Sequence, residues 1–592
     1  MFRFPFLTPV KKKDLSSTSF KDVTSSGFKP FETFLRACAW ISELSGKDLT
    51  SFCNLATADD KSLITYEGDY VTLVKISGMK RLASRDEIQT AAQQLQIDLG
   101  ASFTDPGHAL QFTYVSDPDA SVFMQSNLAE RRTIAQALQA DFEDIFAERE
   151  RVLTPYMRQE RIWLVLWSRT GCLSKAEATS ASKARKKAAL GLPNLGDAQN
   201  PTLGSRELAT IHGAFVGHVL KVFESRGVIL SELPPKEALS VIRTEIYPET
   251  ASGKWSPILP SDPPLNIIPD KERPEDISDA LWPPVREQLF KEDAFTPDFQ
   301  TVRLGCLDWA PVDMTMVSSD VRPFTELTSH LAPYRLPWRM TMHIEGVRSS
   351  YMAWKEHVST LLRFGKNRAV YDGFQELAHM RALRQAVVKL RVSFATSANA
   401  GDTDRLRNRA SRLEQGINGW GGAQATRQCG DPLEGTLSSV PGIALASTAP
   451  PTAAPLDKTL IMAPWARPAR PWEHGAALLR AADGRIVPFD PAGEGRDATL
   501  DLFVAPSRRG KSMLANALLL ATVLSSATLT DTGVKLPLIG KLDIGDATSG
   551  FIDLIVHGLP REHAHLAAYI PYDFIPEHAY NIFDTEACCR RP

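Results

Sequence analysis

The stretch from Thr499 to Ser512 reads Thr-Leu-Asp-Leu-Phe-Val-Ala-Pro-Ser-Arg-Arg-Gly-Lys-Ser, and it decides the fold expected for the last part of the chain. Residues 499–504 are mostly apolar and predict a strand, whereas the uncharged run that begins at Met513 predicts a buried helix. A loop that ends in Gly-Lys-Ser between a strand and a helix is typical of a phosphate-binding P-loop. The stretch therefore predicts the beginning of an α/β nucleotide-binding domain.

The expected nucleotide-binding residues form one loop at the positive end of the expected helix: Ala505, Pro506, Ser507, Arg508, Arg509, Gly510, Lys511 and Ser512. Lys511 is expected to reach the β- and γ-phosphates of ATP, and the hydroxyl of Ser512 to ligate Mg²⁺. Ala505 stands where the consensus has glycine, so the first turn must accommodate a Cβ. Arg508 and Arg509 either favour the triphosphate or point to solvent or a neighbouring subunit.

A second apolar segment, Leu536 to Leu542, predicts another strand, and Asp543 follows it directly. Ligands of parallel α/β sheets bind beyond the carboxyl ends of the strands, which makes Asp543 a candidate for the nucleotide site. A turn-forming aspartate fits the same position equally well. No residue is assigned a catalytic role.

The first half of the chain predicts a separate α+β unit. Apolar segments flank Glu67-Gly-Asp69 and predict a hairpin, and the helical spacing from Ile88 to Leu99 predicts a helix that stops at Gly100. Further strands are expected around Phe112 and over 161–167, with a helix over 126–153 between them. The expected order is β-β-α-β-α-β.

Changes in composition predict the boundaries of the remaining parts. A solvated insertion, rather than a DNA contact, is predicted for residues 173–204, which include the basic run 183–187. A helical hairpin, broken at 398–402, is predicted for residues 347–418. The expected parts are an N-terminal segment 1–60, an α+β domain 61–250, a proline-rich connection 251–300, a mixed domain 301–446, a linker 447–456 and an incomplete P-loop NTPase domain 457–592.

The overall composition describes an ordinary folded protein of several domains. Its 592 residues exceed what one core supports, and a formal net charge of −2 excludes a globally basic nucleic-acid-binding chain. The seven cysteines lack Cys-x-x-Cys spacing, and the first residues lack the order of a secretory signal. The run 513–530 approaches the length of a membrane span, but its polar residues and its place after Gly-Lys-Ser favour a buried helix. A cytoplasmic location is expected.

The residues before the loop resemble one family, the IcmB/DotO and TraU ATPases of type IVB secretion and conjugative transfer. The resemblance covers about 455–592 and rests on Pro464-Trp-Ala-Arg-Pro468, Pro471-Trp472, Gly475, Asp483-Gly484, Pro488-Phe489, Asp543-Ile-Gly545, Ser549-Gly550 and the segment 581–592. It departs from the family at Ile582, where proline is expected, and over 586–588.

The resemblance implies an ATP-driven, RecA-like motor that works as a homo-oligomer, a hexamer, on the cytoplasmic face of the inner membrane. Its partners would be channel proteins and a translocated protein or DNA, and it would energise or assemble the channel. Only 80 residues follow Ser512, so the chain is expected to be truncated and to lack residues needed for turnover. Two alternatives stay open: a non-catalytic assembly subunit with a vestigial P-loop, and an unrelated P-loop enzyme such as a kinase.

Overall fold

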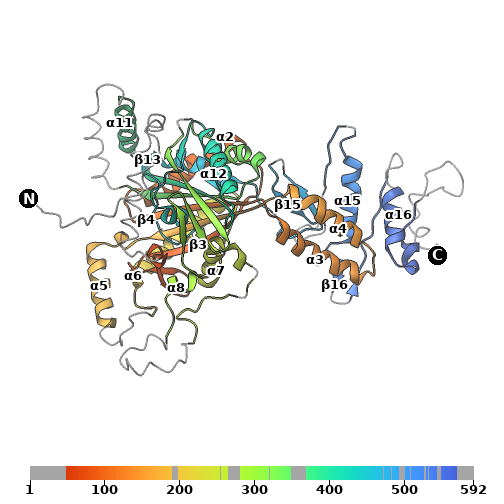
Figure 1. Ribbon diagram of the computed structural model, residues 1–592, viewed down its shortest axis with the longest axis horizontal. Helices are drawn as coiled ribbons and strands as arrows, with labels where there is room; N and C mark the ends of the chain where they lie inside the picture. Colours follow the sequence, from red (N-terminus) through yellow and green to blue (C-terminus); the bar gives the residue numbers. More distant parts are fainter. Residues whose placement is uncertain are drawn as a thin grey trace, which may run out of the picture.

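The computed structural model describes residues 49–189, 198–251, 253, 255–263, 281–318, 320–347, 368–383, 385–470, 472–481, 483–491, 500–506, 508–525, 528–530, 533–542 and 549–569. The described chain forms a large body around one sheet and a narrower arm that projects from it (Figure 1). The arm consists of residues 121–153 together with the C-terminal part from 472 to 569. The protein is thus a mixed α/β molecule in which one broad sheet dominates.

The sheet of the body has 13 strands among the described residues, and every pairing between them is antiparallel. The main path runs β1-β2-β3-β5-β4-β10-β11-β9-β8-β7, while β6 pairs with β3, β12 with β9 and β13 with β11. The strands are β1 (Leu55–Ala58), β2 (Leu63–Thr65), β3 (Tyr70–Met79), β4 (His108–Asp117), β5 (Gln159–Ser168), β6 (Val228–Glu232), β7 (Phe295–Asp298), β8 (Thr301–Leu304), β9 (Leu307–Met316), β10 (Trp338–Gly346), β11 (Val387–Asn399), β12 (Gln424–Thr426) and β13 (Thr452–Pro455).

Two copies of one topology make up this sheet. In the first, β3, α2 (Arg85–Leu99), β4, β5, α6 (Arg206–Ser225) and β6 follow one another, with the spatial order β6-β3-β5-β4. In the second, β9, α9 (Phe324–Leu331), β10, β11, α12 (Thr403–Asn418) and β12 give the order β12-β9-β11-β10. Both are ferredoxin-like, split βαβ arrangements. Because β4 pairs with β10 from Ala109 to Ser116, the two copies join edge to edge into one sheet.

Helices and loops cover both faces of the sheet because successive side chains of each strand point to opposite faces. Leu110, Phe112 and Tyr114 of β4 face a core shared with α2, α6, α9, α12 and α14 (Leu456–Met462). Ala109 and Val115 of the same strand face a core shared with α7 (Pro235–Ile246), α8 (Val285–Leu289) and α13 (Pro432–Leu437). The sheet is therefore the middle layer of the body.

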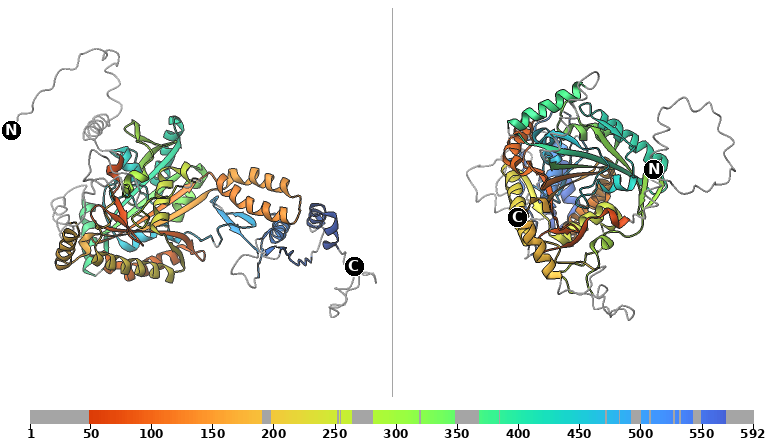
Figure 2. Two further views of the ribbon diagram at one scale, coloured as in Figure 1. Left: turned by 90° about the horizontal axis from the view of Figure 1, so that it is seen from below. Right: turned by 90° about the vertical axis from the view of Figure 1, so that its left-hand side faces the viewer.

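The connection between β4 and β5 leaves the body and forms part of the arm. It holds α3 (Ser121–Ala137) and α4 (Glu143–Leu153), which lie beside the C-terminal elements in all views (Figure 2). Those elements are β14 (Ala477–Arg480), β15 (Ile486–Phe489), α15 (Lys511–Val523), β16 (Leu529–Thr530), β17 (Gly533–Val534) and α16 (Ser549–Gly558). The equivalent connection of the second copy carries α11 (Arg368–Ala382), which lies at the opposite end of the body (Figure 1).

The structure confirms most of the elements expected in the first half. β2 and β3 form the hairpin around Gly68, α2 ends at Leu99, and β4 and β5 are the two expected strands. Ser84 caps α2 with a capping box to Glu87, which fixes where the helix begins. The helix expected over 126–153 is two helices, α3 and α4, separated by a turn in which Gln139 has a φ of 54°.

Two other predictions are wrong, and a third gains detail. The insertion expected over 173–204 contains a helix, α5 (Lys175–Ala189), which includes the basic run 183–187, because alanine and lysine favour helix. The expected helical hairpin over 347–418 is interrupted by the long strand β11, whose alternating apolar residues pack into the sheet. The expected linker contains β13, which pairs with β11. Two segments lie outside the described residues: 348–367, from the first half of the expected hairpin, and 264–280, from the proline-rich connection.

Candidate functional site

The described part of the predicted nucleotide loop has the backbone of a tight turn into a helix. Arg508 has a φ of 62° and Gly510 a φ of 83°, both left-handed, and α15 begins at the next residue, Lys511. No atom lies within 4 Å of where a Cβ of Gly510 would stand, so backbone conformation rather than space requires glycine there. The helix expected after Gly-Lys-Ser is confirmed over Lys511–Val523.

The loop lies open to solvent. Arg508, Arg509, Gly510, Lys511 and Ser512 are all exposed. The first N–H groups of a helix have no partner within the helix, and they carry its positive dipole end. The structure therefore brings Lys511 and Ser512 together at a helix start that an anion can reach. Ala505 and Pro506 precede this turn, whereas Ser507 and the candidate Asp543 lie outside the described residues.

The strands expected on either side of this helix are not formed. Residues 500–504 and 536–542 have no strand pairing, so the two strand predictions are wrong for these described residues. The reason is the lack of neighbours: a strand is stable only where its backbone groups pair within a sheet. Leu500 is 96% exposed and Val504 86%. No RecA-like parallel sheet is present in the part of the chain that the structure describes, where the arm holds only the antiparallel pairs β14–β15 and β16–β17.

The opposite face of α15 fixes the helix to the arm. Leu520 and Leu524 share a core with Leu128, Phe142 and Ile555 from α3, the following turn and α16. Two hydrogen bonds fix the orientation of these elements. Arg131 donates to the carbonyl of Leu524 at 2.7 Å, and the N–H of Asp141 donates to the carbonyl of Gly558 at 2.8 Å. The insertion between β4 and β5 is thus the platform that holds the helix behind the loop.

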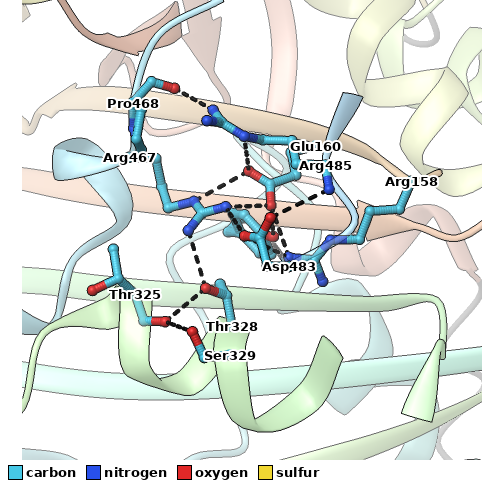
Figure 3. Close-up of polar contacts among 10 residues, drawn as sticks. Arg158, Glu160, Thr325, Thr328, Ser329, Arg467, Pro468, Asp483 and Arg485 are labelled. Atoms are coloured by element: carbon cyan, nitrogen blue, oxygen red, sulfur yellow. Dashed lines mark hydrogen bonds and ion pairs between the residues drawn. The ribbon is translucent and has the colours of Figure 1, made fainter. Parts of the chain in front are cut away.

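Upstream of the loop, two of the family-like residues, Arg467 and Asp483, belong to a buried ion cluster, drawn in Figure 3. The Arg467 guanidinium donates to Glu160 of β5 at 2.7 Å, to Asp483 and to the hydroxyl of Thr328 at 3.1 Å. Arg158 donates to both carboxylates at 3.1 Å. Arg485 completes the cluster by donating to the carbonyl of Pro468. We call these five residues, Arg158, Glu160, Arg467, Asp483 and Arg485, the ion cluster.

The ion cluster keeps its carboxyl groups charged although they are buried. Burial alone would raise the pKa of Asp483, but Arg467 and Arg158 lower it to about 2. Burial likewise opposes ionisation of Glu160, and the same two guanidinium groups lower its pKa below the usual range. Two arginines shared between two carboxylates make a network in which each group compensates the others.

Backbone contacts place the same segment against the body. Trp465, in the 3-10 helix Pro464–Ala466, is fully buried and donates to the carbonyl of Leu460 at 2.7 Å. The N–H of Met79 donates to the carbonyl of Arg467, and the N–H of Ala469 to that of Met79, each at 2.7 Å. Gly78, with a φ of 115°, permits this approach because a Cβ there would overlap the carbonyl oxygen of Arg467.

Sequence reasoning did not single out Glu160, Arg158 or Gly78. Arg467 and Glu160 are 307 residues apart in the chain, so no local pattern connects them. The available signal was weak: Glu160 is an acidic residue next to an apolar run that predicts a buried strand.

Comparison with models of known protein families gives no match, and a search of curated proteins gives none either. In the described part of the chain, no group of three or more His, Cys, Asp or Glu side chains is arranged to hold a metal ion. None of the described helices combines the length and the hydropathy of a membrane span, and α15 itself has 13 residues.

Proposed function

We propose that the chain is an ATP-binding component of a type IVB secretion or conjugation apparatus, in which the loop 505–512 binds ATP with Mg²⁺. One observation carries the proposal: the left-handed Gly510 leads directly into α15, so that Lys511 and Ser512 stand exposed in its first turn. The family-like residues upstream support it, since they hold the approach to the loop against the body through the ion cluster.

The chemistry of the loop suits a nucleoside triphosphate. Unpaired N–H groups at a helix start donate hydrogen bonds to phosphate oxygens, and the lysine beside them neutralises the β- and γ-phosphates. Ser512 supplies the hydroxyl that Mg²⁺ takes in such loops while the metal keeps its contacts with the phosphates. Arg508 and Arg509 add two positive charges beside this site.

Binding and turnover are separable in this proposal. Apolar side chains that a parallel sheet would bury are exposed on both sides of the loop, including Leu500, Val504 and Leu538. Hydrolysis also needs an acidic residue for Mg²⁺ or water and an arginine for the transition state. We propose that neighbouring strands and these groups come from elsewhere in the assembled motor, which acts as a homo-oligomer beside channel proteins at the inner membrane.

A second candidate function is a non-catalytic assembly subunit. The observation that favours it is the body itself, in which both ferredoxin-like copies have all four strands, whereas the described residues form no parallel sheet around the loop. In that role the body binds channel partners and the loop contributes no turnover. The two candidate functions differ in whether a substitution in the loop lowers the affinity for ATP: the ATP-binding component predicts a loss, and the assembly subunit predicts none.

The test is ATP affinity of the whole chain in the presence of Mg²⁺. Lys511→Ala is expected to weaken ATP binding by about tenfold or more, because a charged contact to phosphate contributes roughly 1.5–3 kcal/mol. Lys535→Ala, which removes another exposed lysine of the arm, is the matched control and should bind as the parent does. Equal affinities of parent and Lys511→Ala would contradict the proposal and favour the assembly subunit.

A further inference from the structure

A cavity lies where the family-like segment meets the body. It has a volume of about 340 Å³, within the range of small-molecule sites. Its walls come from β3, from β5, from Phe123 at the start of α3 and from the segment that carries Arg467 and Arg470. Arg467, Arg485 and Glu160 of the ion cluster, whose contacts Figure 3 draws, line one side of it.

The walls of this cavity carry an excess of positive charge. Five cationic side chains line it, Lys75, Arg161, Arg467, Arg470 and Arg485, against two carboxylates, Glu160 and Glu473. Their ion partners behind the wall are Arg158, Asp483 and Glu245. With these three included, two positive charges remain without a compensating carboxylate.

Arg470 is the main source of that excess. It forms no ion pair with any described residue, and its Nη2 atom is buried without a hydrogen-bond partner. The Nε atom of Arg485 is also buried without one. Buried guanidinium groups normally have partners for these donors, and leaving them unpaired costs free energy. Burial lowers the pKa of Arg470, and the neighbouring Arg485 lowers it further against the opposing effect of Glu160.

Aromatic side chains form the remaining wall. Phe123 and His474 stack with their ring centroids 5.9 Å apart and an interplanar angle of 8°. Trp472 also lines the cavity and contacts Phe489 edge to face. A cavity with guanidinium donors on one side and flat rings on the other is complementary to a ligand that joins an anion to an aromatic ring.

We propose that this cavity binds a mononucleotide-class ligand, a phosphate monoester carried on a ring system, with Arg470 and Arg485 holding the phosphate. The free donors of both arginines then gain charge-assisted hydrogen bonds, and the ring lies against Trp472 or His474. The site is separate from the loop 505–512 and does not depend on Lys511. The ligand contacts the segment 467–474 on one side and a strand of the body, β3 or β5, on the other. Its binding therefore also stabilises the docking of that segment on the body.

The experiment titrates AMP into the whole chain carrying Lys511→Ala, with adenosine and inorganic phosphate as comparison probes. AMP is expected to bind saturably, and adenosine about tenfold more weakly or worse because it lacks the charged group. Arg470→Gln should weaken AMP by a similar factor, whereas Arg470→Lys keeps the charge but loses the fork and retains part of the affinity. Arg480→Gln, at an exposed arginine of β14 outside the cavity, is the control and should bind AMP unchanged.

Four results would overturn the proposal, and the first three are no saturable AMP binding, equal affinity for AMP and adenosine, and AMP affinity that Arg470→Gln leaves intact. Phosphate that binds as tightly as AMP would also overturn it, since the ring would then have no role. The Nη2 atom of Arg470 has no hydrogen-bond partner to lose, so variants of Arg470 should keep the parent's melting temperature, and that result would show that they fold. ATP titrations in an Arg470→Gln background test the loop separately, so that failure at one site is not mistaken for failure at the other.

Discussion

At the scale of single residues, Glu160 is the centre of the ion cluster, because it accepts hydrogen bonds from Arg158 and Arg467 and also from the buried hydroxyl of Tyr114. Glu160→Gln removes one of two carboxylates that compensate these arginines. We expect a loss of about 3 kcal/mol or more in the free energy of unfolding, measured by urea denaturation.

Glu473→Gln is the control for that variant, since Glu473 forms an ion pair with Lys75 on the surface and is 80% exposed. Its effect should stay within about 0.5 kcal/mol. Equal losses for the two variants would show that burial does not distinguish the cluster from an ordinary surface pair.

Gly78 gives a second prediction at this scale. Gly78→Ala brings a Cβ against the carbonyl of Arg467 in a backbone conformation that L residues rarely adopt, so it should destabilise the chain by about 3 kcal/mol or more. Gly227→Ala also has a positive φ, 78°, but open space around it, and should cost only about 1 kcal/mol. Thermal unfolding of the two variants compares them, and a smaller loss for Gly78→Ala would contradict the contact.

Asp483 predicts a dependence on pH. Its pKa is about 2 in the folded protein against an ordinary value of 3.8, so its ionised form contributes stability above 3.8. That contribution is lost as the pH falls through about 2, where the folded protein also binds the proton. The free-energy difference between the parent and Asp483→Asn should therefore be about 2 kcal/mol near neutral pH and shrink toward the acid side. Urea unfolding across this range measures it, and a difference that does not change with pH would contradict the assignment.

At the scale of elements, α15 has one anchored face and one exposed start. Leu520→Ala should cost about 2–4 kcal/mol because Leu520 packs in the core of the arm. Leu538→Ala, at a fully exposed leucine in the segment once expected to be a strand, should leave the melting temperature of the chain unchanged. A large loss for Leu538→Ala would contradict the exposure of this side chain.

The same elements show what a single sequence predicts. β2, β3, α2, β4 and β5 follow from local patterns, since turn residues, a capping box and strict alternation act within a few positions of each other. The segments 500–504 and 536–542 have an equally apolar pattern, but a strand also requires neighbours, and the pattern carries no information about those. β11 was mistaken for helix although Val388, Leu390, Val392 and Phe394 alternate with polar residues as a strand requires, because the prediction treated 347–418 as one basic helical region.

At the scale of the whole molecule, the sheet joins two ferredoxin-like copies through β4 and β10, and this was not predicted at all. The copies share topology, and their equivalence appears only when strand order is known. In the candidate site, too, local patterns can be predicted from the sequence and long-range contacts cannot. Lys511 and Ser512 are recognisable from the sequence, whereas the ion cluster and the cavity depend on contacts between residues some three hundred positions apart.

The body and the arm together hold the start of α15 where ATP can reach it. The insertion from the first copy holds α15, the ion cluster holds the segment upstream of the loop, and residues 508–512 face solvent at the start of the helix. ATP bound there should contact the backbone of the first helical turn.

Amide hydrogen exchange of the whole chain with and without Mg·ATP tests this claim most directly. Peptides that cover 508–514 should gain protection when Mg·ATP is added, and Lys511→Ala should abolish that gain. Protection confined to other segments, such as 467–474 beside the cavity, or no protection in any peptide, would contradict nucleotide binding at the loop.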